Sequence, residues 1–282
     1  MSTPVLPPHT LSLEERLRLE PAGEDRFHAL LPGFGAVTLG CATLAAARTT
    51  EFALHSLHAC FLRPTPADRP ALLRVARVRD GRRFAARRVE VLDGDKPCFE
   101  LIASFAAAGS GPEYEEPTPA LALPAPEDLP EEAQVIEEEC LDPTKPGFLG
   151  GAIELRLIGG SPWRASDVSL YRAWARPRMP LPAEPAFHAA AIAYLADLHS
   201  HVPVARRLGY HFEPFGYTSL DQVVWVHRTE PWTDWLLLTS VSDVGHGGRA
   251  FSRRTLHRRD GRLIASMAQE QFVSFAAGEA TG

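Results

Sequence analysis

The same order of predicted elements occurs twice along this chain: a strand, an alanine-rich helix and then four strands. In the first half we expect a strand over 26–31, a helix over 34–48, and strands over 56–62, 72–79, 82–92 and 98–106. In the second half we expect strands over 152–158 and 168–175, a helix over 187–201, and strands over 217–228, 235–241, 249–258 and 262–275. A duplication restricts the fold strongly, because both halves must form the same arrangement.

Short stretches of similar sequence support the duplication. RRFAARR (82–88) is similar to GRAFSRR (248–254), LDGD (92–95) to RDGR (259–262), and IASF (102–105) to IASM (264–267). Their offsets lie between 162 (264 minus 102) and 167 (259 minus 92) residues. Offsets that agree this closely are typical of a repeat with small insertions.

The predicted helix over 187–201 carries an apolar stripe, with Asp197 at its edge. The stripe recurs at helical spacing and consists of Phe187, Ala190, Ala191, Tyr194, Leu195 and Leu198. A sheet with one apolar face must cover another apolar element, and a helix of small residues allows the sheet to curl closely around the helix. The sequence therefore predicts an α+β double hotdog: two tandem hotdog repeats, in which antiparallel sheets each wrap a long helix.

The segment between the halves differs in composition. Residues 112–146 contain eight prolines, and 113–142 contain eleven acids and no base. This composition is typical of an extended linker, and we expect it to stay outside the core. The predicted organisation is an N-terminal repeat over 20–111, the acidic linker over 112–146, and a C-terminal repeat over 147–276.

Composition excludes several classes of protein. The net charge of −6 does not favour a nucleic-acid-binding protein, which is normally basic. The four cysteines form no CxxC pair, so neither a disulfide framework nor a zinc site is predicted. No run approaches the roughly 20 apolar residues of a membrane span. We expect a cytoplasmic protein that binds neither membranes nor nucleic acids.

Six stretches resemble one known family. They are HSLHACFLRP (55–64), RDGRRFAARRVEVLDGD (79–95), AYLADL (193–198), TSLDQVVWVHR (218–228), DWLL (234–237) and RDGRLIASMAQE (259–270). With these stretches the chain resembles the acyl-CoA thioesterase II (TesB-type) family of double-hotdog enzymes over residues 20–275. Several matches in the right order across both halves carry the resemblance.

The resemblance implies a site. In that family a carboxylate, a hydroxyl residue and a glutamine position a water molecule, and these fall on Asp197, Ser219 and Gln269. The implied reaction is hydrolysis of an acyl-CoA thioester by direct attack of this water, with no cofactor and no metal. We expect acyl-CoA as the substrate and a homo-oligomer as the assembly.

The chain departs from the family at three places. Ser219 stands where threonine is usual, which keeps the hydroxyl but loses the methyl group that restricts its rotamer. Val37 replaces the glutamine of the usual Phe-Gly-Gly-Gln, and the asparagine that usually follows the helix aspartate is absent. In the first half, the helix over 34–48 has no acid, and Ile102 is expected at the position of Gln269. The first half is therefore predicted to be structural, and the C-terminal repeat over 147–276 is predicted to carry the active site.

Other sites fit the sequence less well. Ser219, Asp221 and His227 share a strand face, but no G-x-S-x-G motif indicates a nucleophilic triad. The pairs His55/His58 and His199/His201 lack further metal ligands. Gly245–Gly248 is followed by a strand and is typical of a turn. The strand arginines are expected mostly on outward faces, where one or two are suited to bind coenzyme A phosphates.

Two rival functions remain open at this stage. The first keeps the fold and changes the reaction to hydration or dehydration of an acyl thioester, with His58 paired with Asp197. The second is a non-catalytic acyl-CoA or acyl-carrier-binding protein, in which the substitutions at Ser219 and Val37 accompanied the loss of activity.

Overall fold

The computed structural model describes residues 11–116, 123–139, 151–209 except 163, 165 and 167, and 215–275. Its helices are α1 (Leu13–Arg16), α2 (Gly35–Ala47), α3 (Glu132–Glu138), α4 (Pro185–Asp197) and α5 (Val202–Leu208), with a 3-10 turn η3 (Pro126–Asp128). Its strands are β1 (Glu20–Pro21), β2 (Arg26–Ala29), β3 (Ala53–Phe61), β4 (Ala71–Asp80), β5 (Phe84–Asp93), β6 (Lys96–Ala106), β7 (Ile153–Ile158), β8 (Tyr171–Pro177), β9 (Phe215–Ser219), β10 (Asp221–Val226), β11 (Leu236–His246), β12 (Arg249–Arg258) and β13 (Leu263–Phe275).

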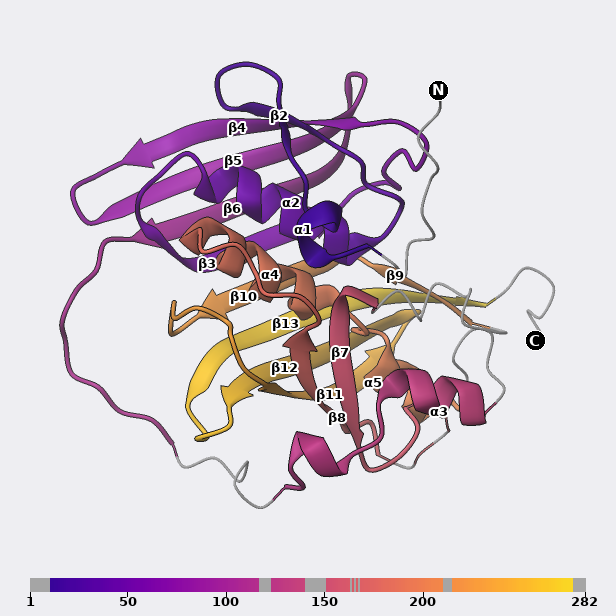
Figure 1. The fold of residues 1–282 in the computed structure, drawn as a ribbon. Coiled ribbons are helices and arrows are strands. Elements are labelled where there is room, and N and C mark those ends of the chain that lie inside the picture. The colour runs from indigo at the N-terminus through magenta and orange to yellow at the C-terminus, as the bar shows by residue number, and fades with distance from the viewer. Residues whose placement is uncertain are drawn as a thin grey trace.

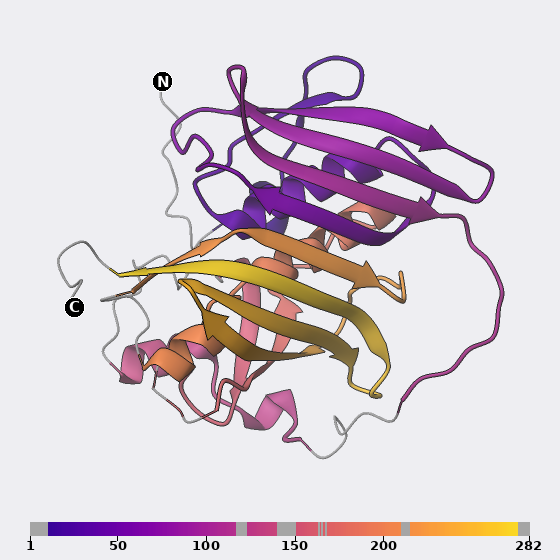
Figure 2. The same cartoon turned by 180° about the vertical axis from the view of Figure 1, so that it is seen from behind.

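Within the described residues the strands form one antiparallel sheet that runs through both halves. Its order is β1-β2-β4-β5-β6-β3-β10-β13-β12-β11-β8-β7, and β9 pairs with β13. The halves join where β3 pairs with β10, with Leu57 opposite Val224. Figure 2 shows β4, β5, β6 and β3 above β10, β13, β12 and β11 on the outer face of this sheet.

The two halves of the sheet are built alike. From the central pair outward, β6, β5 and β4 follow β3, as β13, β12 and β11 follow β10. β5 and β12 alternate between buried and exposed residues in the same pattern along their whole length. The sheet wraps two long helices, which Figure 1 shows in front of it. The double hotdog fold predicted from the sequence is confirmed.

Helices α2 and α4 pack against each other in antiparallel directions. At one end Arg48, which follows α2, makes two hydrogen bonds of 2.9 Å with Glu184, which precedes α4. In the middle, a Cβ on Gly40 would lie 3.4 Å from the carbonyl oxygen of Ala190. Small residues line both helices, so their backbones approach closely. The two helices are buried on nearly all sides rather than along one stripe.

The predicted helix over 187–201 is divided in two. α4 ends at Asp197, because Leu198 has an extended ψ of 124° and His199 has a positive φ of 53°. Pro203 then lies in the first turn of α5, where its missing N–H costs nothing. The strand expected over 217–228 is also divided, into β9 and β10, at Leu220.

The expectation that the acidic segment stays outside the core is wrong for residues 123–139. Val135 of α3 is buried in the main core, and the Trp174 Nε1 donates to the carbonyl oxygen of Pro124 at 2.9 Å. Four of the segment's acids pair with arginines of the C-terminal half: Glu115 with Arg228, Glu127 with Arg259, Glu131 with Arg178, and Glu139 with Arg164. Residues 117–122 and 140–146 of the predicted linker lie outside the described residues.

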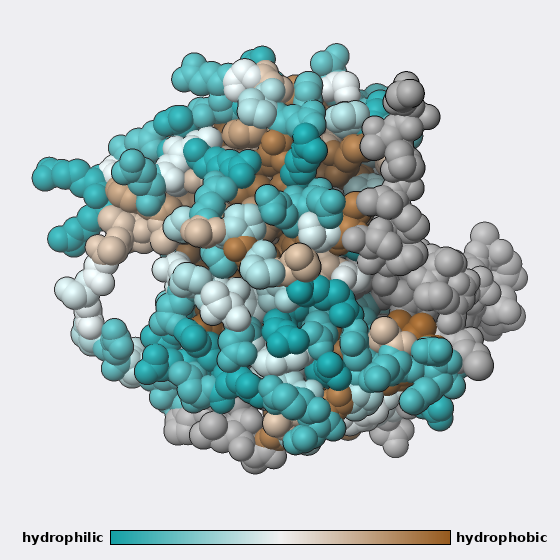
Figure 3. Space-filling view, in the orientation of Figure 1, coloured by the Kyte–Doolittle hydropathy of each residue, from teal (hydrophilic) through white to brown (hydrophobic). Residues whose placement is uncertain are grey.

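The face seen in Figure 1 is mostly hydrophilic over its lower half, whereas hydrophobic residues gather over α1 and α2 in its upper half (Figure 3). Leu13 of α1 and Leu17, which follows α1, are buried, and Leu17 packs against Gly40 of α2. Among the described residues, no helix has the length and apolar character that a membrane span requires.

The halves are expected not to fold separately. Without residues 1–146, β10 loses its partner β3 and presents an unpaired edge, and α4 loses the helix that covers it. Residues 147–282 expressed alone should aggregate or remain poorly folded, and co-expression with residues 1–146 should restore soluble protein. Circular dichroism and size-exclusion chromatography test this, and a soluble, active fragment would contradict it.

Candidate active site

A cavity of about 620 Å³ opens between the two halves at one end of the helix pair. The start of α2, the end of α4, strand β9 and the residues after β3 line it. Phe34, Phe61 and Phe99 give it apolar walls, and Arg63, His199 and His201 add polar groups. Asp197 and Ser219 both line this cavity, and Gln269 is adjacent through its hydrogen bonds to them.

The structure brings the three sequence-predicted residues together from three separate elements. Asp197 is the last residue of α4 and is 6% exposed. Its Oδ1 accepts hydrogen bonds from Gln269 Nε2 at 2.8 Å and from Ser219 Oγ at 3.1 Å. Gln269 Nε2 also donates to Ser219 Oγ at 2.9 Å. Each side chain therefore contacts the other two.

The second carboxylate oxygen of Asp197 faces the start of α2. A Cβ on Gly35 would lie 2.5 Å from Oδ2, so the glycine makes room for the carboxylate. Among the residues that the structure describes, none donates a hydrogen bond to Oδ2. One oxygen is thus fixed by donors, and the other is left to accept a proton within the cavity.

Two further residues hold the site, and sequence reasoning did not select them for it. Gln271 Nε2 donates to Gln269 Oε1 at 3.1 Å and to Ser200 Oγ at 2.8 Å. Ser200 Oγ lies 3.5 Å from Asp197 Oδ1. Because Gln271 binds the carbonyl oxygen of Gln269, it fixes the orientation in which the Gln269 NH₂ group faces the carboxylate. Gln271 shares the inward strand face of Gln269, and this parity is a signal that could have identified it.

Burial raises the pKa of the Asp197 carboxyl above its ordinary value. The hydrogen bonds from Gln269 and Ser219 and the charge of Arg254 act in the opposite direction but do not cancel the effect of burial. A raised pKa makes the carboxylate a stronger base than an exposed aspartate.

The corresponding positions in the first half are buried and apolar: Ala47, Leu54 and Ala103. Ala47 ends α2 as Asp197 ends α4. Leu54 and Ala103 occupy the ladder positions in β3 and β6 that Ser219 and Gln269 occupy in the second half. Among the described residues, the first half therefore has no counterpart of this constellation.

The prediction that Ile102 takes the place of Gln269 is wrong by one residue. Ile102 is 50% exposed on the outer face of β6, whereas Ala103 is buried. The offset between the two repeats was taken from similar turns, which contain small insertions. An error of one residue in this offset moves a strand position to the opposite face of the sheet.

The alternative sites do not form. Asp221 accepts a hydrogen bond from the backbone N–H of Glu270, and His227 contacts Ser266, so neither joins Ser219 in a triad. His58 is exposed and packs against Trp225 on the outer sheet face, away from the buried Asp197. The His58–Asp197 pair of the alternative hydratase hypothesis therefore does not form. Across the described residues, no group of three or more His, Cys, Asp and Glu side chains could hold a metal ion.

Two arginines differ from the expectation of outward faces. Arg87 and Arg254 are 1% and 5% exposed and point into the core. Gly247 and Gly248 have positive φ angles in the turn between β11 and β12, as the turn interpretation requires. The side chains of Arg249 and Arg253 lie on the exposed face and pair with Glu270 and Asp243.

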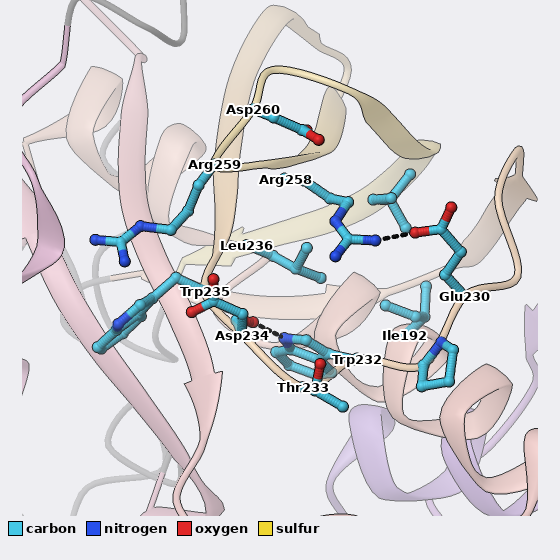
Figure 4. A pocket seen from close by; sticks show the side chains of 12 residues that line it. Ile192, Glu230, Trp232, Thr233, Asp234, Trp235, Leu236, Arg258, Arg259 and Asp260 are labelled. Carbon is cyan, nitrogen blue, oxygen red and sulfur yellow. Dashed lines mark hydrogen bonds and ion pairs between the residues drawn. The ribbon is translucent and has the colours of Figure 1, made fainter.

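A second hollow, of about 200 Å³, lies toward the other end of the sheet (Figure 4). Trp232, Trp235 and Leu236 line it, and Arg258 pairs with Glu230 at its edge. Ile192 of α4 contributes to its wall, but none of Asp197, Ser219 and Gln269 does. The candidate active site is thus the larger cavity.

Comparison with known proteins identifies the family of the chain. Residues 32–106 match the acyl-CoA thioesterase N-terminal domain, and residues 117–273 match the acyl-CoA thioesterase C-terminal domain. The chain is 29% identical to human acyl-coenzyme A thioesterase 8 over 91% of its length and 87% of the relative. It is 25% identical to acyl-CoA thioesterase 2 of Haemophilus influenzae over 95% of its length and 96% of the relative.

A solved structure is similar over the whole fold. The crystal structure of acyl-CoA thioesterase II from Mycobacterium marinum has a TM-score of 0.75 and 30% sequence identity, and the match covers 95% of this chain and 100% of that one. Both domain models match in order, and the sequence and structural relatives agree with them. The chain therefore belongs to the TesB-type acyl-CoA thioesterase II family.

Proposed function

We propose that this chain hydrolyses acyl-CoA thioesters to a free acid and CoA, by direct attack of a water molecule that Asp197 activates. The observation that carries the proposal is the asymmetry of the Asp197 carboxylate. Three side chains hold Oδ1, whereas Oδ2 faces the cavity beside Gly35. A water bound there gives its proton to Oδ2 as its oxygen attacks the thioester carbonyl carbon.

Ser219 and Gln269 act as positioning groups. Their hydrogen bonds to Oδ1 prevent the carboxylate from rotating, so the basic lone pair keeps one direction. Ser219 also keeps the hydroxyl that the family requires, without the methyl group of threonine. Val37 is buried and does not line the cavity, so the contact of the missing glutamine is not replaced by this residue.

The start of α2 supplies the group that stabilises the negative charge on the thioester oxygen. The first N–H groups of a helix have no intrahelical partner, and Phe34, the N-cap of α2, makes no side-chain capping bond. The amide groups of Gly35 and Ala36 therefore favour an oxyanion at this end of the cavity. The thiolate of CoA leaves as the tetrahedral intermediate collapses.

The cavity suits an amphipathic substrate. Its phenylalanine walls accept apolar groups, and the exposed side chain of Arg63 at its lining is suited to a phosphate of coenzyme A. The non-catalytic rival is disfavoured because a binding protein has no need of a fixed, buried carboxylate, whose desolvation costs free energy. The hydratase rival loses its proposed His58–Asp197 pair.

The division into repeats at 20–111 and 147–276, with 112–146 between them, stays a proposal, as do cytoplasmic location, a role in fatty acid metabolism and a homo-oligomeric state. Limited proteolysis tests the boundaries, cell fractionation the location, and light scattering the oligomeric state.

A thiol-release assay tests the proposed function. Acyl-CoAs from acetyl-CoA to palmitoyl-CoA are supplied one at a time, and free CoA is followed with a thiol reagent. We expect turnover with at least part of the series. Loss of the enoyl absorbance without release of thiol would identify a hydratase instead, and binding without either reaction would identify a binding protein.

Asp197→Asn should lower turnover on the order of 10²–10⁴-fold, because the amide cannot accept the proton of the attacking water. The melting temperature should stay the same or rise, since the amide avoids the desolvation cost of a buried carboxylate. The measurement is kcat beside a melting curve. Asp243→Asn, which changes an exposed carboxylate of the same half, is the matched control and should be nearly silent.

Ser219→Ala and Gln269→Ala should each lower kcat as well. Either change combined with Asp197→Asn should add little to the loss, because the three side chains act as one unit. Retained turnover in Asp197→Asn, or fully additive losses, would contradict the mechanism.

The pH dependence follows from the raised pKa of Asp197. The value of kcat/KM should rise with pH as one carboxyl loses its proton, with a midpoint above the ordinary value of 3.8. Asp197→Asn should remove this limb from the residual activity. An acid limb at or below 3.8 would contradict the assignment of Asp197 as the base.

The ionisation of Asp197 also lowers the folding stability. Because the folded protein holds the proton more tightly than the unfolded chain, folding stability falls as the pH rises from 3.8 to the raised folded value, and the loss is complete above it. The melting temperature of the parent relative to Asp197→Asn should therefore fall over this interval and then stay constant.

Gly35→Ala should lower kcat by at least 10-fold, an order-of-magnitude expectation for misplacement of a reacting group by about 1 Å. The new methyl group would lie 2.5 Å from Asp197 Oδ2 and must displace the carboxylate. Gly111→Ala, which meets no atom within 4 Å, is the control. Unchanged kcat in folded Gly35→Ala would show that Oδ2 does not have to occupy this position.

A further inference from the structure

Arg254 is buried behind the site, at the end of the helix that carries Asp197. It lies on the inner face of β12 and is 5% exposed. Its Nη1 donates to three backbone carbonyl oxygens: Leu195 at 2.8 Å, Ala196 at 3.0 Å and Leu198 at 2.6 Å. The first two carbonyls belong to the last turn of α4, where helical C=O groups lack intrahelical partners, and the third belongs to Leu198, which follows the helix.

The contacts fix the place where α4 ends. Leu198 leaves the helix with an extended ψ, and His199 has a positive φ, which residues other than glycine rarely adopt. One guanidinium nitrogen that binds carbonyls on both sides of Asp197 holds this irregular turn. The direction of the Asp197 side chain depends on the same turn.

The charge of Arg254 matters as much as its hydrogen bonds. A buried carboxylate at a helix C-terminus faces the negative end of its own helix dipole. Arg254 lowers the pKa of Asp197 and thus opposes the effect of burial. Burial in turn lowers the pKa of Arg254 to about 10, so the guanidinium keeps its charge at neutral pH.

Other titratable groups surround this pair, and each is part of the electrostatic environment. They are Tyr194 of α4, His199 and His201 after α4, Tyr217 of β9, Tyr171 of β8, Arg206 of α5, and Glu132 of α3, which lies 3.1 Å from His199. Arg254 is the cation whose charge acts on both Asp197 and Tyr171.

We propose that Arg254 is a positioning residue for the hydrolysis: its guanidinium binds the last carbonyls of α4, orients Asp197 and favours the ionised form of that carboxylate. This inference rests on the proposed function, because it assigns Arg254 a part in preparing the general base. Arg254 itself contacts neither the cavity that holds the substrate nor the carboxylate oxygens.

Three substitutions separate the charge from the hydrogen bonds. Arg254→Lys keeps the charge and can still donate, Arg254→Gln keeps donors without charge, and Arg254→Met removes both. Arg253→Met is the matched control, because Arg253 is the next residue on β12, points to the exposed face and pairs with Asp243.

We expect the acid limb of kcat/KM to move upward by about one pH unit or more in Arg254→Gln and Arg254→Met, the effect of losing a nearby opposite charge. Arg254→Lys should keep the limb near that of the parent, and Arg253→Met should leave both kcat and the limb unchanged. A folded Arg254→Met with an unmoved acid limb would overturn the proposal.

Carbon-13 NMR of the Asp197 carboxyl supplies a readout that needs no turnover. Its titration midpoint should rise in Arg254→Gln and Arg254→Met relative to the parent. If the parent shows no thioester hydrolysis but this shift occurs, the proposed function fails and the electrostatic link stands. If hydrolysis occurs and the midpoint does not move, the proposal for Arg254 fails alone.

The neutral variants could also fail to fold. In that case Asp197→Asn is added to Arg254→Met, and we expect it to restore part of the melting temperature, because it removes the buried charge that Arg254 balances. A double variant as unstable as the single variant would overturn the electrostatic part of the proposal.

Discussion

The close antiparallel packing of α2 against α4 is the interaction on which the rest of the structure depends. Alanine and glycine let the two backbones approach, as at Gly40 and Ala190, and the Arg48–Glu184 pair holds one end. At the other end, this packing sets the start of α2 against Asp197 at the end of α4. The positive end of one helix dipole thereby faces a carboxylate that its own helix disfavours. The candidate base and the amides for the oxyanion thus come from different halves of the chain.

In the proposed mechanism only one end of the duplicated scaffold is reactive among the described residues, and the two halves differ there in a few side chains. Both halves supply a helix and four strands in the same order, and β5 and β12 share one pattern of burial. Ala47 and Asp197 end equivalent helices, yet the first is apolar and the second is a buried acid. Burial of that acid costs free energy, which Gln269, Ser219 and Arg254 partly offset. The first half avoids this cost and serves as the wall of the shared cavity.

Much of the fold followed from the sequence, because helical and strand periodicities, Asp-Gly turns and internal similarity are local signals. The three site residues followed from family resemblance, and the geometry places them in mutual contact. The end of α4 at Asp197 could not be predicted, because a buried arginine from a distant strand fixes it. Arg254 shares strand parity with Ala250 and Leu256, a signal for an inward side chain that the outward-facing expectation overlooked. The Ile102 error arose because the offset between the repeats was taken from the turns. The turns differ by small insertions, so the same offset is wrong by one residue within the strands.

The central claim is that water, held by Asp197, attacks the thioester directly. A single turnover with enzyme in excess over acyl-CoA, in water enriched in ¹⁸O, tests it most directly. Mass spectrometry of the quenched reaction reports the label in the product acid and in the peptides that contain Asp197 and Ser219. The account predicts one ¹⁸O atom in the acid, no ¹⁸O in Asp197 and no acylated peptide at any time. Label in the Asp197 carboxyl, or an acyl group on Ser219 that forms and decays at the rate of turnover, would contradict it.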